Sequence, residues 1–522
     1  PKSLIINGLA LFFLLSNLVE SHATADKFRC SWRDNPATSM VVGWDQESGN
    51  DPVFYYGMTD FGANQSKYTL SRKPDRIQKA KGMTNCFVRL TGLQANTVYY
   101  FVIKDSEGVS KRMSFCTASD NPDDRLSIVA GGDSRNMHEA RINANKMVAK
   151  LRPNFVLFGG DMTDHDADDE WEDWMDDWQN TIPADGRLTP IIVSRGNHEA
   201  DNNTLINLFD IDAKGNYYAL NFGGNLLRVY TLNSFMPPAG DQKNWLINDL
   251  EKNKSAIHRI AQYHLPMRPH TQAKEPNQEQ TIHWSPIFAK YGLKLAVECD
   301  AHVIKYTYPI RPSTGSGSDD GFVRDDEQGT TYIGEGCWGA PLRQHNRDKS
   351  WTRNSDAFNG FHWIWVDKNK MEVRTVKVDN VAKAQAIHPQ NLFAVPQGVE
   401  IWTPSNGAVL NIKPSSGNAL ATNNNTTTPT TSADNELANL PTMNADASTE
   451  VIKFKYKLTQ ESDVNVKLYN LKFTEVFSND FPKQKAGEYN YPLSVKKFPA
   501  GRYILIIKGA NKPVMKYVLV KK

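Results

Sequence analysis

Residues 126–164 read LSIVAGGDSRNMHEARINANKMVAKLRPNFVLFGGDMTD, and this stretch decides the fold of the central part of the chain. The apolar runs Leu126–Ala130 and Phe155–Phe158 are typical of buried strands, and Ala140–Leu151 between them indicates a helix. The apolar segment at residues 190–194 predicts a further strand. Strands that alternate with helices predict an α/β core whose functional side chains lie in loops at the carboxyl ends of the strands.

Shorter alternating segments lie on both sides of this core, which we expect to span residues 123–385. Residues 27–120 contain runs of period two broken by turn residues, and this pattern predicts a β-sandwich. Residues 450–522 alternate in the same way and predict a second, C-terminal β-sandwich. Residues 403–449 are rich in Asn, Thr, Ser and Pro and too poor in apolar residues to pack, so we predict a linker there. The expected fold class is therefore multidomain.

The first residues have the pattern of a secretory signal peptide. Lys2 precedes the apolar run Leu4–Val19, and the small-residue exit Ser21-His22-Ala23 follows it, so we predict a signal peptide over residues 1–23. A membrane anchor is the alternative, but the run is short for a span. We expect the mature protein to be exported and to have no transmembrane segment. Over the whole chain, 60 Lys and Arg residues nearly balance 58 Asp and Glu residues, which gives no basic field for nucleic-acid binding.

Five short motifs follow predicted strands in the central part of the chain, and each contains a side chain that can bind a metal. Two metal ions about 3.5–4 Å apart need a shared carboxylate and several ligands each, so loops from several strands must converge. Each motif alone is a weak signal, but together and in one domain they predict a dinuclear metal site. The motifs are Gly132-Asp133-Ser134-Arg135, Gly160-Asp161-Met162-Thr163-Asp164, Gly196-Asn197-His198-Glu199, Tyr263-His264-Leu265-Pro266 and Cys299-Asp300-Ala301-His302.

In this order and spacing the motifs resemble those of the calcineurin-like metallophosphoesterases, and in particular of the purple acid phosphatases. The stretch Trp32–Met40 is similar to the fibronectin-III-like domain of that family, and Gly329–Gly336 is similar to the strand after its last motif. The resemblance implies a central domain of two sheets flanked by helices. It also implies a secreted phosphatase that hydrolyses phosphate monoesters of small molecules by attack of a metal-bound hydroxide. A phosphodiesterase or nucleotide hydrolase on the same metals, or a surface protein that binds without turnover, is the alternative.

The resemblance also implies a role for each motif residue. Two divalent or trivalent ions (Fe, Mn or Zn) would be held by seven residues, with Asp161 bridging them: Asp133, Asp161, Asp164, Asn197, His264, Asp300 and His302. His198 would act on the leaving oxygen as general acid or transition-state stabiliser. Arg268, His270 and Arg343 are candidate substrate-side groups. Arg135 either forks onto the substrate phosphate or forms a structural ion pair with the acidic loop.

Two positions depart from the pattern of the family. Asp164 stands where the purple enzymes have a tyrosine, so the charge-transfer colour of an iron–phenolate pair is not expected. Asp300 stands where the family has the first histidine of its last motif, and it would add an anionic oxygen ligand that favours oxygen-loving ions. A second register slides this motif by two residues. His302 is then the first histidine, Ile304 replaces the second, and Asp300 need not touch metal.

Two further segments have predictions of their own. Trp171 and Trp174 lie within the acidic stretch Asp161–Asp177 and Trp178 follows it, and their helical spacing predicts one buried face and one solvated acidic face. A second cation site in this stretch is the alternative. The C-terminal segment, with its glycine turns and closing Lys516–Lys522, resembles the sorting domain of the bacterial type IX secretion system. This resemblance implies the type IX machinery as a partner and secretion, or display on the cell surface, by a Gram-negative bacterium. A carbohydrate-binding or merely structural sandwich is the alternative.

Overall fold

The computed structural model describes residues 24–415, 451–458, 460–470, 475–499, 501–508 and 514–520. The chain divides into two compact units, Pro1–Ala421 and Thr422–Lys522. The expected signal peptide over residues 1–23 lies outside the described residues, as does most of the expected linker. Among the described residues, no helix combines the length and the apolar character that a membrane span requires.

The N-terminal part of the first unit consists of two four-stranded antiparallel sheets. One has the order β1-β2-β6-β5 and the other the order β4-β3-β7-β8. Aromatic side chains fill the space between them, and the rings of Phe54 and Phe101 stack with centroids 4.6 Å apart. The strands are β1 (Ala25–Ser31), β2 (Ser39–Gln46), β3 (Val53–Gly57), β4 (Leu70–Arg72), β5 (Arg76–Ala80), β6 (Met83–Thr91), β7 (Val98–Lys104) and β8 (Met113–Cys116), with the short helix η1 (Gln65–Lys67) before β4.

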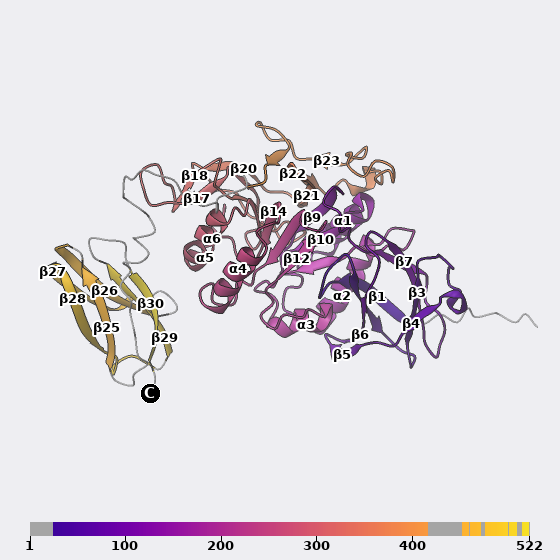
Figure 1. Cartoon of the computed structure of the whole chain (residues 1–522), viewed down its shortest axis with the longest axis horizontal. Coiled ribbons are helices and arrows are strands. Elements are labelled where there is room, and N and C mark those ends of the chain that lie inside the picture. The colour runs from indigo at the N-terminus through magenta and orange to yellow at the C-terminus, as the bar shows by residue number, and fades with distance from the viewer. Residues whose placement is uncertain are drawn as a thin grey trace, which may run out of the picture. The chain divides into compact units, whose positions relative to one another are not determined.

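The central part of the chain contains two seven-stranded sheets (Figure 1). The first has the order β11-β10-β9-β21-β22-β23, with β24 also paired to β22. It consists of β9 (Leu126–Gly131), β10 (Phe155–Phe158), β11 (Ile191–Val193), β21 (Gly360–Asp367), β22 (Lys370–Lys377), β23 (Glu400–Ile401) and β24 (Leu410–Ile412). The second has the order β12-β13-β14-β15-β19-β16-β20. It consists of β12 (Tyr218–Phe222), β13 (Leu227–Thr231), β14 (His258–Gln262), β15 (Leu295–Glu298), β16 (Ile304–Thr307), β19 (Thr331–Gly334) and β20 (Thr352–Asp356). A separate hairpin pairs β17 (Ile310–Pro312) with β18 (Phe322–Arg324).

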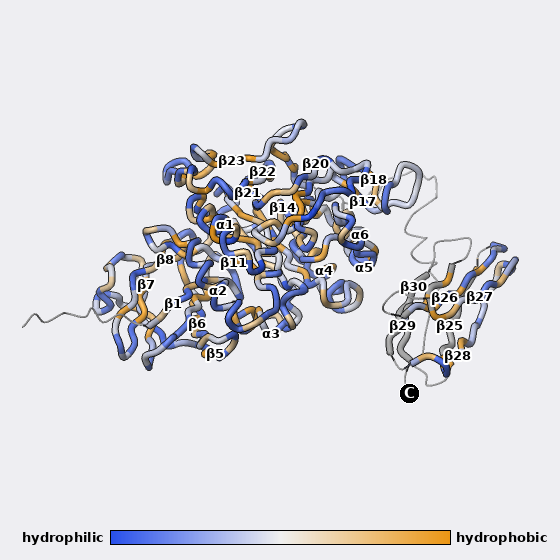
Figure 2. The backbone as a smooth tube through the Cα atoms, turned by 180° about the vertical axis from the view of Figure 1, so that it is seen from behind, coloured by the Kyte–Doolittle hydropathy of each residue, from blue (hydrophilic) through white to orange (hydrophobic). Residues whose placement is uncertain are grey.

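The two sheets pack against each other, and helices cover their outer faces. On β9, Ile128 lies in the core between the sheets, whereas its neighbour Val129 lies in a second core beneath helices. That second core contains buried side chains of α1, α2 and α3, and a third core contains those of α4 and α6 over the second sheet. Hydrophobic residues gather in the inner strands (Figure 2). The helices are α1 (His138–Leu151), α2 (Asp168–Trp178), α3 (Asn202–Phe209), α4 (Asp241–Lys252), α5 (Gln278–His283) and α6 (Ser285–Lys290), with the short helices η2 (Gln179–Thr181) and η3 (Val381–Lys383).

These layers agree with the predicted fold class, a sandwich domain followed by an α/β domain of two sheets flanked by helices. The predicted tryptophan face is confirmed, because Trp171, Trp174 and Trp178 are all buried on α2. The linker expected over residues 403–449 contains a strand near its start. There Leu410 and Ile412 are buried, and β24 pairs with β22, so this segment belongs to the central sheet.

The second unit consists of strands with their own buried core. A four-stranded sheet has the order β27-β26-β29-β30, and β25 pairs with β28. Val466, Leu468 and Leu505 are among the side chains that form the core of this unit. The strands are β25 (Val451–Leu458), β26 (Ser462–Asn470), β27 (Glu475–Gln484), β28 (Gly487–Ser494), β29 (Gly501–Lys508) and β30 (Val514–Val520).

Candidate metal centre

The candidate site lies where loops from both central sheets meet. Strands β9, β10 and β11 are parallel neighbours, so the loops after them leave the same edge of the first sheet. Strands β14 and β15 are parallel neighbours in the second sheet. Asp133 and Asp161 follow strands of the first sheet, and His264 and Asp300 follow strands of the second. All four side chains are buried.

A first cluster is formed by Asp133, Asp161 and His302, whose ligand atoms all lie within 4.8 Å of one another. His302 Nε2 is 3.2 Å from Asp133 Oδ1. The other ring nitrogen, Nδ1, is 2.9 Å from the carbonyl oxygen of Pro341, so the proton belongs on Nδ1. His302 Nε2 is then a buried lone pair without a hydrogen-bond donor, aimed at a carboxylate. Two acceptors that face each other in this way fit a metal ion between them.

A second cluster is formed by Asp161, His264 and Asp300. His264 Nδ1 is 2.8 Å from the carbonyl oxygen of Gly159, which places a proton on Nδ1, so Nε2, which faces oxygen acceptors, can bind either a second proton or a metal ion. Nε2 is 3.1 Å from Asn197 Oδ1, 3.3 Å from Asp161 Oδ1 and 3.7 Å from Asp300 Oδ1. Asp161 belongs to both clusters. The donor set therefore fits two ions with a shared carboxylate.

Burial and charge act against each other on these groups. Burial opposes ionisation of Asp161, but the attraction of His264 and His198 outweighs it and holds the pKa of Asp161 below its ordinary value. Burial likewise opposes ionisation of Asp300, but the hydrogen bond and charge of His264, together with Lys274, lower the pKa of Asp300 to about 2. Asp161 and Asp300 are thus held as anions, which attract cations.

Several residues of the motif loops have left-handed backbone conformations. The φ angles are 59° for Asp133, 54° for Asp161, 70° for Asp300 and 55° for His302. Each such conformation costs a non-glycine residue about 1–3 kcal/mol, and it persists only where the surroundings impose it. These residues belong to three different motifs, and their side chains all converge on the clusters. The strained backbone conformations therefore occur where the loops bring these side chains together.

One glycine allows the loops to approach closely. A Cβ atom at Gly196 would lie 2.2 Å from Asp161 Oδ1 and 2.4 Å from the Asp161 nitrogen. The distances are far below van der Waals contact, and the opposing atoms include backbone. Any side chain at Gly196 would therefore separate the loop that carries Asn197 from the loop that carries Asp161.

His198 is held beside the clusters by backbone contacts. Its backbone nitrogen donates to Asp161 Oδ1 at 3.0 Å, and its Nδ1 lies 2.5 Å from the carbonyl oxygen of Asp164. The proton therefore belongs on Nδ1, and Nε2 lies 3.7 Å from Asp161 Oδ2. The half-buried ring can exchange a proton at Nε2 with a molecule that is bound at the clusters.

Arg135 and Asp164 form an ion pair at the edge of the first cluster. Arg135 Nη1 lies 3.0 Å from Asp164 Oδ1, and Nη2 lies 3.4 Å from Asp161 Oδ2. The structural alternative for Arg135, pairing with the acidic loop, is thus formed, and the contact still leaves its guanidinium next to the site. Asp164 was predicted as a ligand, but it belongs to neither cluster.

The three substrate-side candidates divide into one that reaches the site and two that do not. Arg343 Nη1 donates to the carbonyl oxygen of Asp300 at 2.7 Å. The Arg268 side chain is buried, and its guanidinium is used by contacts that include Met267, Thr281 and Asp320.

His270 is also buried, and its Nε2 lies 2.7 Å from Thr352 Oγ1. The predicted roles of Arg268 and His270 are therefore corrected. Their loop turns into the second sheet and its helices, so their polar groups support the structure there.

Two buried acidic residues brace the ligand loops, and neither was assigned from the sequence. The Glu199 carboxylate accepts from the backbone nitrogens of Asp161 at 3.2 Å and Met162 at 2.9 Å, and also from Gly196 at 2.5 Å. Burial, with repulsion from Asp161, raises the pKa of Glu199 to about 7. In the sequence, the only indication of this supporting role of Glu199 is its position next to Asn197-His198.

Asp166 connects the same loops to the N-terminal sandwich. Its Oδ2 accepts from the Ala200 nitrogen at 3.1 Å and from Thr204 Oγ1 at 3.0 Å. Lys81, from the turn between β5 and β6, lies 2.8 Å from the same oxygen. The sandwich domain therefore contacts Asp166 directly, and Asp166 in turn supports the loop that carries Asn197.

The geometry distinguishes the two registers of the last motif. Asp300 lies in the second cluster, as the first register requires. Ile304, the vacated ligand position of the second register, is buried in β16 and belongs to the core between the sheets. Tyr306, which supported that register, is also buried there, with its hydroxyl 2.6 Å from Thr375 Oγ1. The first register is therefore favoured.

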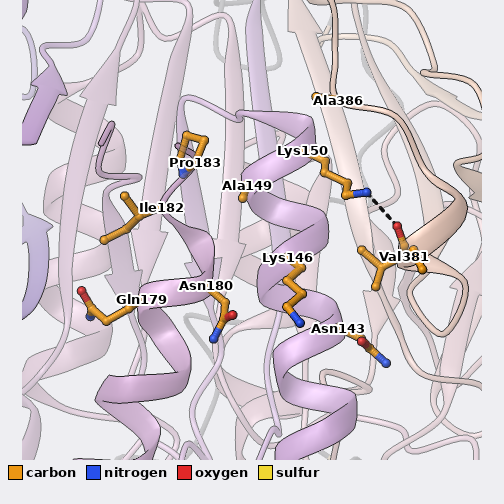
Figure 3. Close-up of a pocket in the computed structure, with 11 residues that line it drawn as sticks. Asn143, Lys146, Ala149, Lys150, Gln179, Asn180, Ile182, Pro183, Val381 and Ala386 are labelled. Atoms are coloured by element: carbon orange, nitrogen blue, oxygen red, sulfur yellow. Dashed lines mark hydrogen bonds between the residues drawn. The ribbon is translucent and has the colours of Figure 1, made fainter. Parts of the chain in front are cut away.

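A surface groove of about 670 Å³ lies apart from these clusters (Figure 3). It runs between α1, η2 and the segment after β22, and Lys150 Nζ donates to the Val381 carbonyl oxygen across one side at 2.9 Å. None of the cluster residues lines it. The convergence of buried ligand atoms, rather than the volume of a cavity, identifies the candidate site.

Comparisons with known proteins agree with this geometry. Residues 25–117 match the family of the purple acid phosphatase N-terminal domain, and residues 132–302 match the calcineurin-like phosphoesterase family. Comparison with curated proteins finds no significant match. The two domain matches identify the chain as a metal-dependent phosphoester hydrolase.

Two solved structures share the fold at low sequence identity. Purple acid phosphatase PPD1 from yellow lupin (Lupinus luteus) seeds is 13% identical with a TM-score of 0.56, over 71% of this chain and 76% of that chain. The structure of PhoD is 11% identical with a TM-score of 0.54, over 75% of this chain and 93% of that chain. These similarities show the architecture alone, and they confirm the predicted fold class.

Proposed function

We propose that the protein is an exported phosphatase that holds two metal ions and hydrolyses phosphate monoesters of small molecules. The observation that carries this proposal is the pair of buried clusters that share Asp161. Asp133 and His302 would complete the ligand set of one ion, and Asn197, His264 and Asp300 that of the other. Bound ions, Fe, Mn or Zn, supply Lewis acidity and lower the pKa of water near the phosphorus.

The residues around the clusters suit the charge changes of phosphoryl transfer. His198 carries its Nδ1 proton toward the Asp164 carbonyl oxygen, so its Nε2 is free to take up a second proton and to donate it to the leaving oxygen. Arg135 and Arg343 contact groups of the two clusters from outside and present positive charge to the non-bridging phosphate oxygens. We therefore assign proton transfer to His198 and phosphate binding to the two arginines.

A monoester is favoured over a diester by the charge at the edge of the site. A phosphate monoester carries a second negative charge near neutral pH, which a diester lacks. Arg135 and Arg343 supply cations at the edge of the site, in addition to any bound metal. A phosphodiesterase or nucleotide hydrolase on the same site, or a binding protein without turnover, would give a different substrate profile.

Turnover of paired chromogenic substrates tests this proposal. The full chain is stripped of metal, supplied with Mn²⁺, Zn²⁺ or Fe, and assayed with an aryl phosphate monoester and the matching diester. We expect metal-dependent hydrolysis with a higher kcat/KM for the monoester. A preference for the diester would overturn the monoester assignment, and no turnover with any metal would favour a binding protein.

We also propose that residues 450–522 are a sorting domain for the type IX secretion machinery of a Gram-negative bacterium. The protein would meet this machinery after its signal peptide, residues 1–23, is removed. The separate core of the second unit supports a domain that can be recognised by itself. In this proposal residues 27–120 and 123–385 are the exported sandwich and catalytic domains. Deletion of residues 450–522 should leave activity intact and retain the protein in the periplasm of a host with this machinery. Unchanged export would contradict the assignment.

A further inference from the structure

Lys274 is a basic residue that contacts the candidate metal centre and has no assigned role. It lies in the loop between β14 and α5, after His264, and its ammonium group pairs with Asp300 Oδ1. The Lys274 side chain is 25% exposed and the Asp300 side chain 5%. The carbonyl oxygen of Lys274 accepts from Arg347 Nη1 at 2.9 Å, so the loop is fixed where the pair forms.

The Asp300 carboxylate faces two kinds of partner. Its Oδ1 is 3.7 Å from His264 Nε2 within the second cluster. The same oxygen accepts from the Lys274 ammonium group. The Asp300 backbone is held independently, because its nitrogen donates to Asp133 at 3.0 Å and its carbonyl oxygen accepts from Arg343 at 2.7 Å. Loss of Lys274 would therefore change the charge at Asp300 more than its position.

We propose that Asp300 and Lys274 act as one unit at the second metal ion, with Asp300 as ligand and Lys274 as a positioning residue that neutralises its charge. This inference rests on the proposed dinuclear function. A carboxylate has about four lone-pair sites, so it can accept from an ammonium group while it binds a metal ion. The pair as a whole carries no net charge, which makes it equivalent in charge to a neutral imidazole ligand.

The unit predicts a defined effect of Lys274 on metal affinity. Lys274→Met leaves the Asp300 carboxylate unpaired and removes the repulsion between the ammonium group and the metal ion. Binding at the second cluster should therefore become at least tenfold tighter, equivalent to about 1.4 kcal/mol. Lys274→Arg, which keeps the charge, should retain the wild-type affinity, and Asp300→His, which removes the anionic ligand and keeps the cation, should weaken binding.

Calorimetric titration of the metal-stripped full-length chain with Mn²⁺ and with Zn²⁺ tests this effect without use of activity. The set comprises wild type, Lys274→Met, Lys274→Arg and Asp300→His. Lys368→Met is the matched control, because it removes a lysine from a surface pair with Asp123, away from the motif loops. It should leave both affinities unchanged. Thermal unfolding of the stripped proteins establishes that each variant is folded.

The outcomes separate this inference from the function on which it rests. Two bound ions in the wild type, with an unchanged or weaker affinity in Lys274→Met, would overturn the Asp300–Lys274 unit and leave the proposed function intact. A wild type that binds fewer than two ions would overturn the dinuclear proposal and this inference with it. If Lys274→Met does not fold, Lys274→Gln replaces it, with the same tenfold criterion.

Discussion

Asp161→Asn is the substitution that tests the dinuclear site most directly. Asp161 is the only residue that belongs to both clusters found among the described residues. Asparagine has nearly the same shape and keeps one oxygen, so the fold should survive while the charge is lost. Both ions are then expected to bind more weakly at once, and turnover should disappear.

The size of the effect follows from the contacts of Asp161. Each cluster loses one of its three Asp or His groups, and a charge-assisted contact is worth about 1.5–3 kcal/mol. That loss corresponds to roughly tenfold to a hundredfold in each affinity. A metal concentration of a hundred times Kd stabilises a folded protein by about 2.7 kcal/mol. The same concentration would leave the variant about 90% saturated after a tenfold loss and half-saturated after a hundredfold loss, with about 1.4 and about 0.4 kcal/mol of stabilisation, respectively.

Thermal unfolding with and without metal measures this difference. For an unfolding unit the size of the central domain, residues 123–385, about 2.7 kcal/mol corresponds to a rise in Tm of roughly 5 °C in the wild type. The Asp161→Asn variant should show a smaller rise of about 1–3 °C and a bound-metal content below that of the wild type. A variant that retains two ions and full activity would refute the assignment of Asp161 as the shared ligand. A variant with a strongly reduced Tm in the absence of metal would show instead that Asp161 serves the fold.

Three further substitutions have separable readouts. His198→Ala should lower kcat by about 10²–10⁴-fold with nearly normal metal content, since His198 is proposed to act on the leaving group; loss of metal would make it a ligand or a support. Lys81→Met removes the partner of the buried Asp166 and should lower the free energy of unfolding, measured by chemical denaturation, by about 1–3 kcal/mol. Lys81→Arg, which keeps the charge, should restore part of this free energy. Burial lowers the pKa of His362 to about 3. As the pH falls below about 6.5, His362 therefore takes up a proton in the unfolded state but not in the folded state, and the free energy of unfolding decreases. His362→Phe should remove this part of the acid sensitivity between pH 7 and pH 5, and an unchanged slope would contradict it.

The elements around the site could be predicted because their signals are local. The apolar run Leu126–Ala130 corresponds to β9, and the helix predicted at Ala140–Leu151 corresponds to α1 with two more residues at its start. Strand and helix periodicity are properties of neighbouring residues, so a single sequence contains them. The same holds for the tryptophan face of α2, whose spacing fixes its buried side.

The supporting contacts of the site could not be predicted, because they join residues that are far apart in the sequence. Lys81 belongs to the sandwich domain but contacts Asp166. Lys274 and Arg268 lie in one loop, yet the first reaches Asp300 and the second turns away into the packing around Met267. No periodicity distinguishes two basic residues six positions apart on an irregular loop, and only the folded path of the loop separates their roles.

The two aspartates that depart from the family pattern have one structural feature in common. Asp164 is paired with Arg135 at 3.0 Å, and Asp300 is paired with Lys274. The sequence predicts a more anionic centre from these carboxylates, but each of them lies beside a cation that offsets its charge. The net charge at the centre is therefore close to that of a site with neutral residues at both positions. Any preference for Mn or Fe over Zn must then arise from the oxygen donor of Asp300 itself rather than from added negative charge. Because Asp164 is paired with Arg135 instead of joining a cluster, an ion at the first cluster would have fewer protein ligands and more room for water or substrate oxygen.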